Sequence, residues 1–526
     1  MNKGTKLAIA GTVAVLLCGG SYAVVDAAGL LKKSGPLSDD EIHSVAQEFL
    51  GAWGDGNVDT AADLTDDSAA ASDALARFWR ELGPEMSAQV VREDTAKVDF
   101  RVTLRVKHDN AGSVWAYDSS LRTVRDQETG EPRVVWSPTV VHPGLTRKGD
   151  ALDIVEASGL SIQATDRDGT KLTAEEFPSL AAVLPDLGKR YGEKLGGRPG
   201  VEVRVTRRDG TAGPSLHTVS RGKPATLRTT LSAGLQRAAE RAVKKYPQSS
   251  AVAVEPSSGE ILAVANNRTD GFNAAFLGGR APGSTMKIVT TAALLEKGLV
   301  EAAKPAPCPK FASYEGATFH NLDKFTIENG TFSDAFIRSC NTTFIGFADD
   351  IDGDTLTREA KEVFGLGLEW RSGVATFDGS VPQAEGGEKA AGMIGQGKVQ
   401  ANALNMASVA ATAVTGQFRQ PVLVSPDLDG REIAETDRSL PDDVAGQLRD
   451  MMRRTATQGT AAEALSGLTG DVGAKTGSAE VGGEEVSDSW FTGFRDDVAA
   501  AAMVEAGGHG GDAAGPVVRD ILAAGK

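Results

Sequence analysis

The chain begins with Lys3 and Lys6, which are followed by an uncharged and mostly apolar stretch, 7–25. This stretch comes close to the roughly 20 residues that a helix needs to cross a bilayer. Lysines on its amino-terminal side indicate that this end faces the cytoplasm, since cytoplasmic flanks are enriched in Lys and Arg. We therefore expect a cytoplasmic tail at 1–6, a single-pass membrane anchor at 7–25 and an extracytoplasmic location for the remainder.

A signal peptide that is cleaved after export remains an alternative, because the small residues of Ser21 to Ala23 suit a signal peptidase. Lipidation of Cys18 is a further alternative, although bulky Leu17 precedes this cysteine where a small residue is expected. We favour the retained anchor. Under either main interpretation the rest of the chain lies in an oxidising compartment, where disulfides persist.

A chain of 526 residues is longer than one hydrophobic core usually supports, so we expect roughly two to four domains. The hydrophobic content of 41% and the charged content of 24% are those of a folded globular protein. The formal net charge of -16 argues against a nucleic-acid partner, which would require a basic surface.

Helical periodicity starts at Ser38 to Glu41, which has the sequence of a capping box. Large apolar residues then recur every three or four positions in two stretches, the second of which ends near Gly83. The residues on these expected helix faces are Ile42, Val45, Phe49, Leu50, Trp53, Leu75, Phe78, Trp79 and Leu82.

The hydrophobic period changes to two further along the chain. Apolar and polar residues alternate over 98–106, and two more strand-like runs follow at 114–124 and 134–141. Helices followed by an antiparallel meander predict a small α+β domain at 38–148, which we interpret as a spacer or docking domain. The next segment, 149–224, mixes charge, glycine and short apolar runs, and we expect a strand-rich linker domain there.

The sequence APGSTMKIVT at 281–290 places a lysine inside an apolar run. Ser284 and Lys287 are three residues apart, so they share one face of a helix that starts after the Pro-Gly turn. The apolar neighbours of Lys287 favour its neutral amine, which can act as the base for a serine nucleophile. The alternative is an N-cap serine and a lysine whose charged end reaches solvent. A second S-x-x-K, Ser220 to Lys223, shows that this pattern alone does not decide.

Other catalytic classes find little support. None of the six histidines pairs with another at metal-ligand spacing, and neither H-E-x-x-H nor C-x-x-C occurs, so we expect no metal and no cofactor. The G-x-S-x-G motif of many Ser-His-Asp hydrolases is absent. The glycines of GLGLEW lack the strand-then-helix context of a dinucleotide fingerprint.

Two further motifs follow STMK in order: SCN at 339–341 and KTGS at 475–478. Each is weak alone, but their order and separation are specific. Together they resemble the S-x-x-K, S-x-N and K-T-G motifs of the penicillin-recognising acyl-serine transferases. Within that superfamily the chain resembles a class B penicillin-binding protein, a peptidoglycan D,D-transpeptidase.

The sequences around the motifs carry the same resemblance, which covers roughly 225–526. PSSGEILAVAN resembles the strand pair before the nucleophile, IGQGKVQANALNMA the G-Q-G segment, and DSWFTGF the strand beside K-T-G. Ala474 replaces a frequent glycine and Ser478 a frequent threonine, but both are small and compatible with acylation. The segment 38–148, which ends in VVWSPTVVHPGL, resembles the nuclear transport factor two-like domain of some class B members.

The resemblance implies a multidomain α+β fold. A single N-terminal membrane helix would precede a small cone-like α+β domain, the strand-rich linker or dimerisation-type domain and a C-terminal α/β transpeptidase domain. The last would hold a central antiparallel sheet flanked by helices, with an all-helical subdomain.

The resemblance also implies the chemical roles of the motif residues. Ser284 would attack the carbonyl of a D-Ala-D-Ala bond, and Lys287 would take its proton. Ser339 would relay a proton to the departing amine, and Asn341 would hold the donor peptide's amide and Lys287.

The K-T-G strand would bind the substrate. Lys475, as a fixed positive charge, would hold the terminal carboxylate of the peptide or of a β-lactam together with Thr476 and Ser478. Gly477 would allow close approach of the backbone, and the N–H groups of Ser284 and Ser478 would form the oxyanion hole.

Cys308 and Cys340 are the two cysteines outside the apolar stretch. We expect them to form a disulfide beneath the S-x-N loop, because both neighbours of Cys340 face the cleft and its own side chain should point away. Two buried free thiols are the alternative.

The expected activity is cross-linking of stem peptides by transfer of the acyl group from Ser284 to an acceptor amine. Alternatives are a D,D-carboxypeptidase, which gives the acyl group to water, and a non-catalytic penicillin-binding sensor or divisome scaffold. The expected partners are D-Ala-D-Ala donor peptides, acceptor amines, β-lactams, the cytoplasmic membrane and, by analogy, a separate glycosyltransferase.

Overall fold

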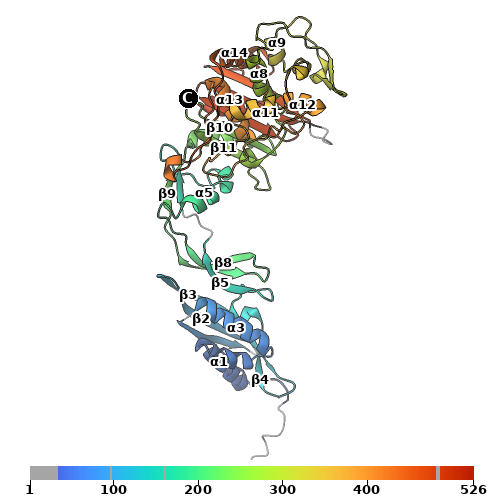
Figure 1. Cartoon of the computed structure of the whole chain (residues 1–526). Coiled ribbons are helices and arrows are strands. Elements are labelled where there is room, and N and C mark those ends of the chain that lie inside the picture. The colour runs from blue at the N-terminus through green and yellow to red at the C-terminus, as the bar shows by residue number, and fades with distance from the viewer. Residues whose placement is uncertain (1–33, 84, 95–96, 158–161, 481–485, 526) are drawn as a thin grey trace, which may run out of the picture. The chain divides into compact units, whose positions relative to one another are not determined.

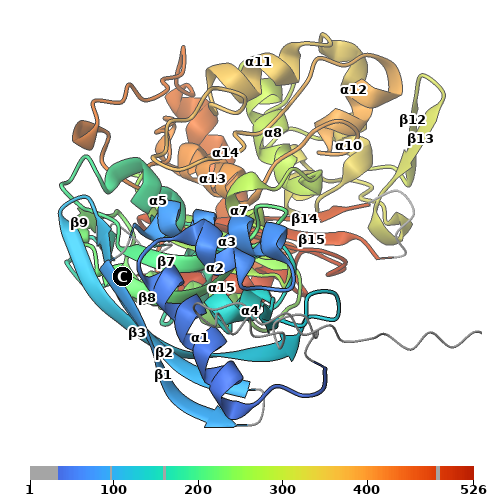
Figure 2. The same ribbon diagram turned by 90° about the horizontal axis from the view of Figure 1, so that it is seen from below.

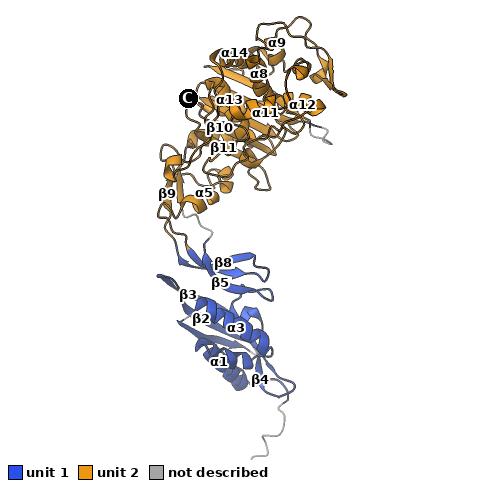
Figure 3. Ribbon diagram, viewed as in Figure 1, with its two compact units in different colours: residues 1–157, 201–221 blue, residues 158–200, 222–526 orange. Residues whose placement is uncertain are grey.

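The computed structural model describes residues 34–83, 85–94, 97–157, 162–480 and 486–525. The predicted tail and anchor at 1–25 lie outside these residues. None of the helices in the described ranges is both long enough and apolar enough to span a bilayer. The chain divides into two compact units, which we call unit 1 (1–157 and 201–221) and unit 2 (158–200 and 222–526), as Figure 3 shows.

In unit 1, three helices pack on one face of an antiparallel sheet (Figures 1 and 2). The helices are α1 (Asp39–Gly54), α2 (Val58–Asp63) and α3 (Ser68–Leu82), and the sheet has the order β1 (Glu85–Asp94), β2 (Lys97–His108), β3 (Ala111–Arg125), β4 (Pro132–Val135). The predicted capping box forms at Ser38 and Glu41, and Gly83 ends α3 in the left-handed conformation. Trp53 packs edge-on against Phe78 and Phe100 in the core.

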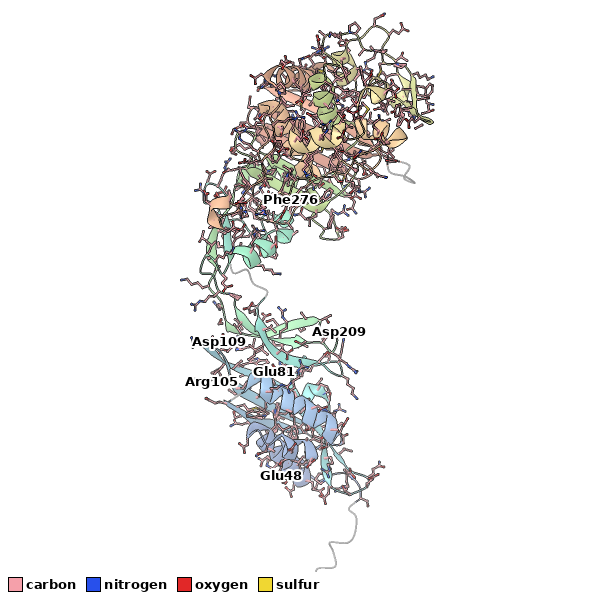
Figure 4. The ribbon with its side chains drawn as sticks, in the orientation of Figure 1. Glu48, Glu81, Arg105, Asp109, Asp209 and Phe276 are labelled. Carbon is pink, nitrogen blue, oxygen red and sulfur yellow. A yellow bond between two sulfur atoms is a disulfide. The ribbon has the colours of Figure 1, made fainter. Side chains whose placement is uncertain are left out.

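The predicted alternation in β2 is confirmed. Val98, Phe100 and Val102 are fully buried, whereas Arg101 and Arg105 lie on the exposed face. Figure 4 labels Arg105 on this face and Glu48 on α1, two of the charged side chains that cover unit 1.

The predicted strand at 134–141 is only partly correct. The strand β4 ends at Val135, and Pro138–Val141 forms the short helix α4. The Ser137 hydroxyl accepts a hydrogen bond from the Thr139 N–H, and Pro138 fits the first helical turn, where it needs no N–H partner.

The segment 149–224, for which the sequence suggests one linker domain, is divided between the two units. The sheet β5 (Ala151–Glu156), β7 (Val201–Thr206) and β8 (Ala212–Ser220) belongs to unit 1, and its Leu152 and Val203 join the core of that unit. The strands β6 (Ile162–Thr165) and β9 (Ala225–Arg228), the 3₁₀ helix η2 (Pro178–Ala182) and α5 (Leu184–Tyr191) belong to unit 2.

A five-stranded antiparallel sheet forms the centre of unit 2. Its order is β11 (Ile261–Asn267), β10 (Ser249–Val254), β16 (Val498–Val504), β15 (Asp488–Arg495), β14 (Val472–Ala479). One face packs on α6 (Ala233–Val243) and α15 (Ala514–Ala524), and the other on α13 (Ala403–Thr415) and α14 (Asp442–Gln458). The helix α8 (Lys287–Glu296) packs on α13 and α14. Because both faces are covered, β10 and β16 are buried along their whole length.

The remaining elements of unit 2 are mostly short helices (Figure 1). They are α7 (Ala274–Leu277), η3 (Gly283–Met286), η4 (Leu322–Lys324), α9 (Phe332–Ile337), α10 (Asn341–Ile345), η5 (Ala348–Asp350), α11 (Thr355–Glu362), α12 (Gly386–Met393) and η6 (Pro426–Leu428). The subdomain predicted as all-helical also contains a hairpin, β12 (Phe311–Tyr314) and β13 (Ala317–His320).

Candidate active site

Ser284 and Lys287 lie on consecutive turns at the start of α8. Ser284 is in the 3₁₀ turn η3, and Lys287 is the first residue of α8. The Lys287 Nζ lies 3.0 Å from the Ser284 Oγ, so the two side chains are within hydrogen-bond reach. Gly283, with φ of +52°, gives the chain the left-handed turn that leads into η3.

The Lys287 amine is completely buried and has two further partners. It donates to the Ser339 carbonyl at 2.9 Å and to the Asn341 Oδ1 at 2.7 Å. Burial lowers the pKa of Lys287 well below its usual value, and the nearby charge of Lys475 lowers it further. A neutral amine has two hydrogens and one lone pair, so the two acceptors leave the lone pair for the Ser284 hydroxyl.

The S-x-N loop joins α9 to α10 and brings Ser339 and Asn341 to the same place. Ser339 has φ of +57°, a conformation that a residue with a side chain adopts only when its surroundings enforce it. Its carbonyl faces Lys287, and its hydroxyl accepts a hydrogen bond from the Lys475 Nζ at 2.8 Å. Ser339 therefore lies between two amines.

Lys475 extends from the edge strand β14 and is completely buried. It also donates to the Thr476 carbonyl at 2.9 Å. Burial lowers the pKa of Lys475 to about 7. In the free protein this amine therefore titrates near neutral pH, and the fixed positive charge expected from the sequence requires an anionic ligand beside it.

Gly477 lies in close contact with the turn that holds Ser284. A Cβ atom there would lie 2.9 Å from the Pro282 carbonyl oxygen and 3.0 Å from the Thr285 nitrogen. A Cβ atom on Gly283 would likewise lie 2.4 Å from the Ser478 carbonyl oxygen. Glycine at both positions allows the backbones of β14 and η3 to approach.

Cys308 and Cys340 form a disulfide, and both are buried. Their Cα atoms are 6.3 Å apart. Since Cys340 stands between Ser339 and Asn341, the disulfide ties the S-x-N loop to the segment before β12.

Two polar residues at this site carry no signal in the sequence. The Thr460 and Thr476 hydroxyls are 2.5 Å apart, and the fully buried Asn321 accepts a hydrogen bond from the Asn341 N–H at 2.8 Å. Neither Thr460 nor Asn321 belongs to a motif, and only the folded backbone brings these two residues to the site.

Comparison with protein families identifies both parts of the chain. The model described as penicillin binding protein transpeptidase domain matches residues 249–523, and that of an NTF2-like N-terminal transpeptidase domain matches residues 43–149. The predicted resemblances of the two regions are thereby confirmed.

Similar proteins come from mycobacteria. The chain is 28% identical over 331 residues to peptidoglycan D,D-transpeptidase PbpA of Mycobacterium tuberculosis. This match covers 52% of this chain and 66% of that protein. It is 30% identical over 273 residues to PbpA of Mycolicibacterium smegmatis, with 46% of this chain and 54% of that protein covered. The chain thus spans just under two thirds of the first relative and about half of the second.

Solved structures share the fold at lower identity. The D,D-transpeptidase domain of a peptidoglycan glycosyltransferase from Eggerthella lenta gives a TM-score of 0.52 at 22% identity, covering 70% of this chain and 98% of that one. Pseudomonas aeruginosa PBP2, solved in complex with WCK 5153, gives 0.55 at 20% identity, covering 71% and 96%. The transpeptidase model matches 249–523, which is more than half of this chain. The chain therefore belongs to the penicillin-binding protein transpeptidase family.

Proposed function

We propose that this protein is a serine D,D-transpeptidase that cross-links peptidoglycan stem peptides through an acyl group on Ser284. The observation that carries the proposal is the contact of the Ser284 hydroxyl with a buried amine, 3.0 Å away, whose hydrogens have two other acceptors. This arrangement supports Lys287 as the base that takes the serine proton.

The bond changes in acylation balance within the site. The Ser284 Oγ bonds to the carbonyl carbon of the penultimate D-Ala, and the bond to the terminal D-Ala nitrogen breaks. The serine proton moves to Lys287 and then, through the Ser339 hydroxyl, to the departing amine. The hydrogen bond that Ser339 accepts from Lys475 supports this relay, because it leaves the Ser339 hydrogen free to be donated.

The oxyanion of the tetrahedral intermediate needs donors that already point at it. We assign this role to the backbone N–H groups of Ser284 and Ser478. The close approach of Gly283 to the Ser478 backbone supports this assignment. Each such donor contributes about 3 kcal/mol to the transition state.

The substrate's terminal carboxylate would bind Lys475, Thr476 and Ser478. Binding an anion favours the ammonium form of Lys475, so its pKa rises from about 7 in the complex. In the second half-reaction an acceptor amine attacks the ester carbonyl and passes its proton to Lys287. The bond from the acyl carbon to the Ser284 Oγ breaks, and Lys287 returns a proton to this oxygen. Asn341 would hold both the donor amide and Lys287.

We also infer a single-pass anchor at 7–25 that keeps the part of the chain after it outside the cytoplasm. The disulfide between Cys308 and Cys340 supports an oxidising compartment. The domain at 38–148 would serve as a spacer or docking domain, and a separate glycosyltransferase would supply the glycan strands.

Labelling with fluorescent penicillin tests the proposal. The full-length protein is expected to bind one label per chain, and Ser284→Ala is expected to bind none while keeping its unfolding transition. Incubation with a donor strand and an acceptor amine then distinguishes cross-linked product from free D-Ala produced by hydrolysis. Labelling that persists in Ser284→Ala would refute the assignment of the nucleophile, and hydrolysis alone would make the protein a carboxypeptidase.

A further inference from the structure

Asn321 lies between β13 and η4, and its side chain is completely buried. Its Oδ1 accepts hydrogen bonds from the Asn341 N–H at 2.8 Å and the Thr342 N–H at 3.1 Å. Its Nδ2 donates to the Pro309 carbonyl at 2.9 Å and the Phe325 carbonyl at 2.8 Å. Both donors and both lone pairs of the amide are used, and exchanging O and N would place each against a group of the wrong kind.

The two ends of this amide have different effects. The Nδ2 ties two loop carbonyls together, which is an ordinary structural role. The Oδ1 holds the first two N–H groups of α10, the helix that begins with Asn341. These N–H groups have no partner within a helix, so an acceptor at this point fixes where the helix starts.

The chain next to Asn321 also orients the Asn341 side chain. The carbonyl of His320 accepts a hydrogen bond from the Asn341 Nδ2 at 2.8 Å. With its nitrogen held there, the Asn341 amide presents Oδ1 to the Lys287 Nζ at 2.7 Å. One two-residue segment, 320–321, therefore holds both the backbone and the side chain of Asn341.

The loop before Asn341 needs such support. Ser339 is held in the left-handed conformation, which is strained for a residue with a side chain. If the start of α10 were released, the loop would relax. The Asn341 Oδ1 would then no longer take a hydrogen of the Lys287 amine, and the lone pair of that amine would turn away from Ser284.

We propose that Asn321 is a positioning residue for acylation: through its Oδ1 it fixes Asn341, and through Asn341 it orients the Lys287 amine toward the Ser284 hydroxyl. The inference rests on the proposed function. It assigns Asn321 no contact with substrate, and it leaves the carboxylate clamp of Lys475 and Thr476 unaffected.

The test measures acylation of the full-length protein by penicillin. Rapid-mixing kinetics separate the binding constant from the acylation rate constant. Asn321→Ala is expected to reach one label per chain with an unchanged binding constant, while the acylation rate constant falls roughly 10²-fold, as misplaced groups produce. Asn321→Asp keeps an oxygen in the place of Oδ1. Its buried carboxyl is expected to be protonated and to donate one hydrogen bond from the place of Nδ2, so that most of this loss is recovered. Gln236→Ala, which removes another fully buried amide that bonds the Val264 backbone, is the control and is expected to acylate at the wild-type rate.

A double-mutant cycle gives the decisive result. If Asn321 acts through Asn341, adding Asn321→Ala to Asn341→Ala changes the acylation rate constant less than threefold, although both variants together lower stability. The proposal would be overturned if Asn321→Ala lowered the acylation rate constant equally in wild type and in Asn341→Ala. It would also be overturned if Asn321→Ala only reduced the fraction of chains that become labelled, while those chains acylated at the wild-type rate. If Asn321→Ala does not fold, Asn321→Asp is compared with wild type instead, and a 10²-fold slower acylation there would overturn the role of Oδ1.

The failure of this inference differs from failure of the proposed function. A wild-type protein that binds no penicillin, or a Ser284→Ala variant that still does, contradicts the function itself. Normal wild-type labelling with additive effects of the two asparagines contradicts only the role of Asn321.

Discussion

Lys475 is a completely buried amine in the free protein, and we predict that replacing it with methionine stabilises the fold while abolishing acylation. Methionine has nearly the same length and volume but carries no charge. Burial lowers the pKa of Lys475 from 10.5 to about 7. The unfolded chain therefore holds this proton more tightly than the folded protein, which costs stability wherever the unfolded side chain is protonated.

The magnitude follows from the two pKa values. The lowered pKa of Lys475 reduces the free energy of unfolding by about 4 kcal/mol at pH 7 and by about 2 kcal/mol at pH 9, compared with a lysine whose pKa does not change on folding. The hydrogen bonds of Lys475 to Ser339 and to the Thr476 carbonyl offset roughly 2 kcal/mol of this. Lys475→Met should therefore gain about 2 kcal/mol at pH 7 and almost nothing at pH 9.

The pH dependence is the diagnostic part, because the lost hydrogen bonds shift the whole curve without changing its slope. Urea unfolding of wild type and Lys475→Met, followed by tryptophan fluorescence at several pH values from 7 to 9, measures the difference directly. All other titrating groups are shared by the two proteins, so their contributions largely cancel. Above pH 7 Lys475 is mostly neutral, and its removal then disturbs the titration of Lys287 little.

The stability of wild type is expected to rise with pH through this window relative to Lys475→Met. A difference that is flat from pH 7 to 9 would refute the lowered pKa of Lys475. In the same samples, penicillin labelling of Lys475→Met should fall at least 10²-fold, because the carboxylate of the β-lactam loses its cation.

Two further predictions concern neighbours of the motifs. Thr460→Val removes the hydroxyl that lies 2.5 Å from the Thr476 hydroxyl, and the loss of this hydrogen bond should weaken penicillin binding about 3–10-fold with little change in the acylation rate constant. Thr460→Ser should restore binding, whereas an unchanged binding constant in Thr460→Val would show that Thr460 does not orient Thr476. Replacing both Cys308 and Cys340 with serine should lower the free energy of unfolding by about 3–4 kcal/mol, because the disulfide closes a loop with a sequence separation of 32 residues. The double variant should also lose the mobility shift between reducing and non-reducing gels, and the absence of this shift in wild type would contradict the disulfide.

The motif residues could be brought together from the sequence because their chemistry is specific. A lysine in an apolar run after Ser284 predicts an amine with a lowered pKa, and burial of Lys287 follows from the same neighbours. The order of STMK, SCN and KTGS then identifies three segments that converge, although nothing in their spacing says how. The strand β14, the S-x-N loop and the turn η3 supply that geometry.

The supporting residues could not be predicted in the same way. Asn321 precedes Asn341 by 20 residues, and its hydrogen bonds depend on the path of the backbone after β13. An isolated asparagine or threonine in a loop has the same appearance whether it faces solvent or a helix start. Hydrophobic period likewise predicted β2 and α1 correctly but missed the edge strand β1. None of its residues is buried, and the alternation of exposed and half-buried positions ends after 91, so the apolar signal is weak.

Two amines in one site create a conflict that the burial of Lys287 resolves. While Lys475 is charged it repels a proton on Lys287, which favours the free base before substrate binds. A bound carboxylate cancels much of that field, so a base that depended on Lys475 alone would regain its proton at the moment when it has to accept one. Burial is the larger cause of the lowered pKa of Lys287, and it does not depend on the substrate, because the amine is already completely buried in the free protein. Burial therefore preserves the neutral form of Lys287 when the carboxylate of the substrate offsets the charge of Lys475, and the proposed base stays ready in the complex.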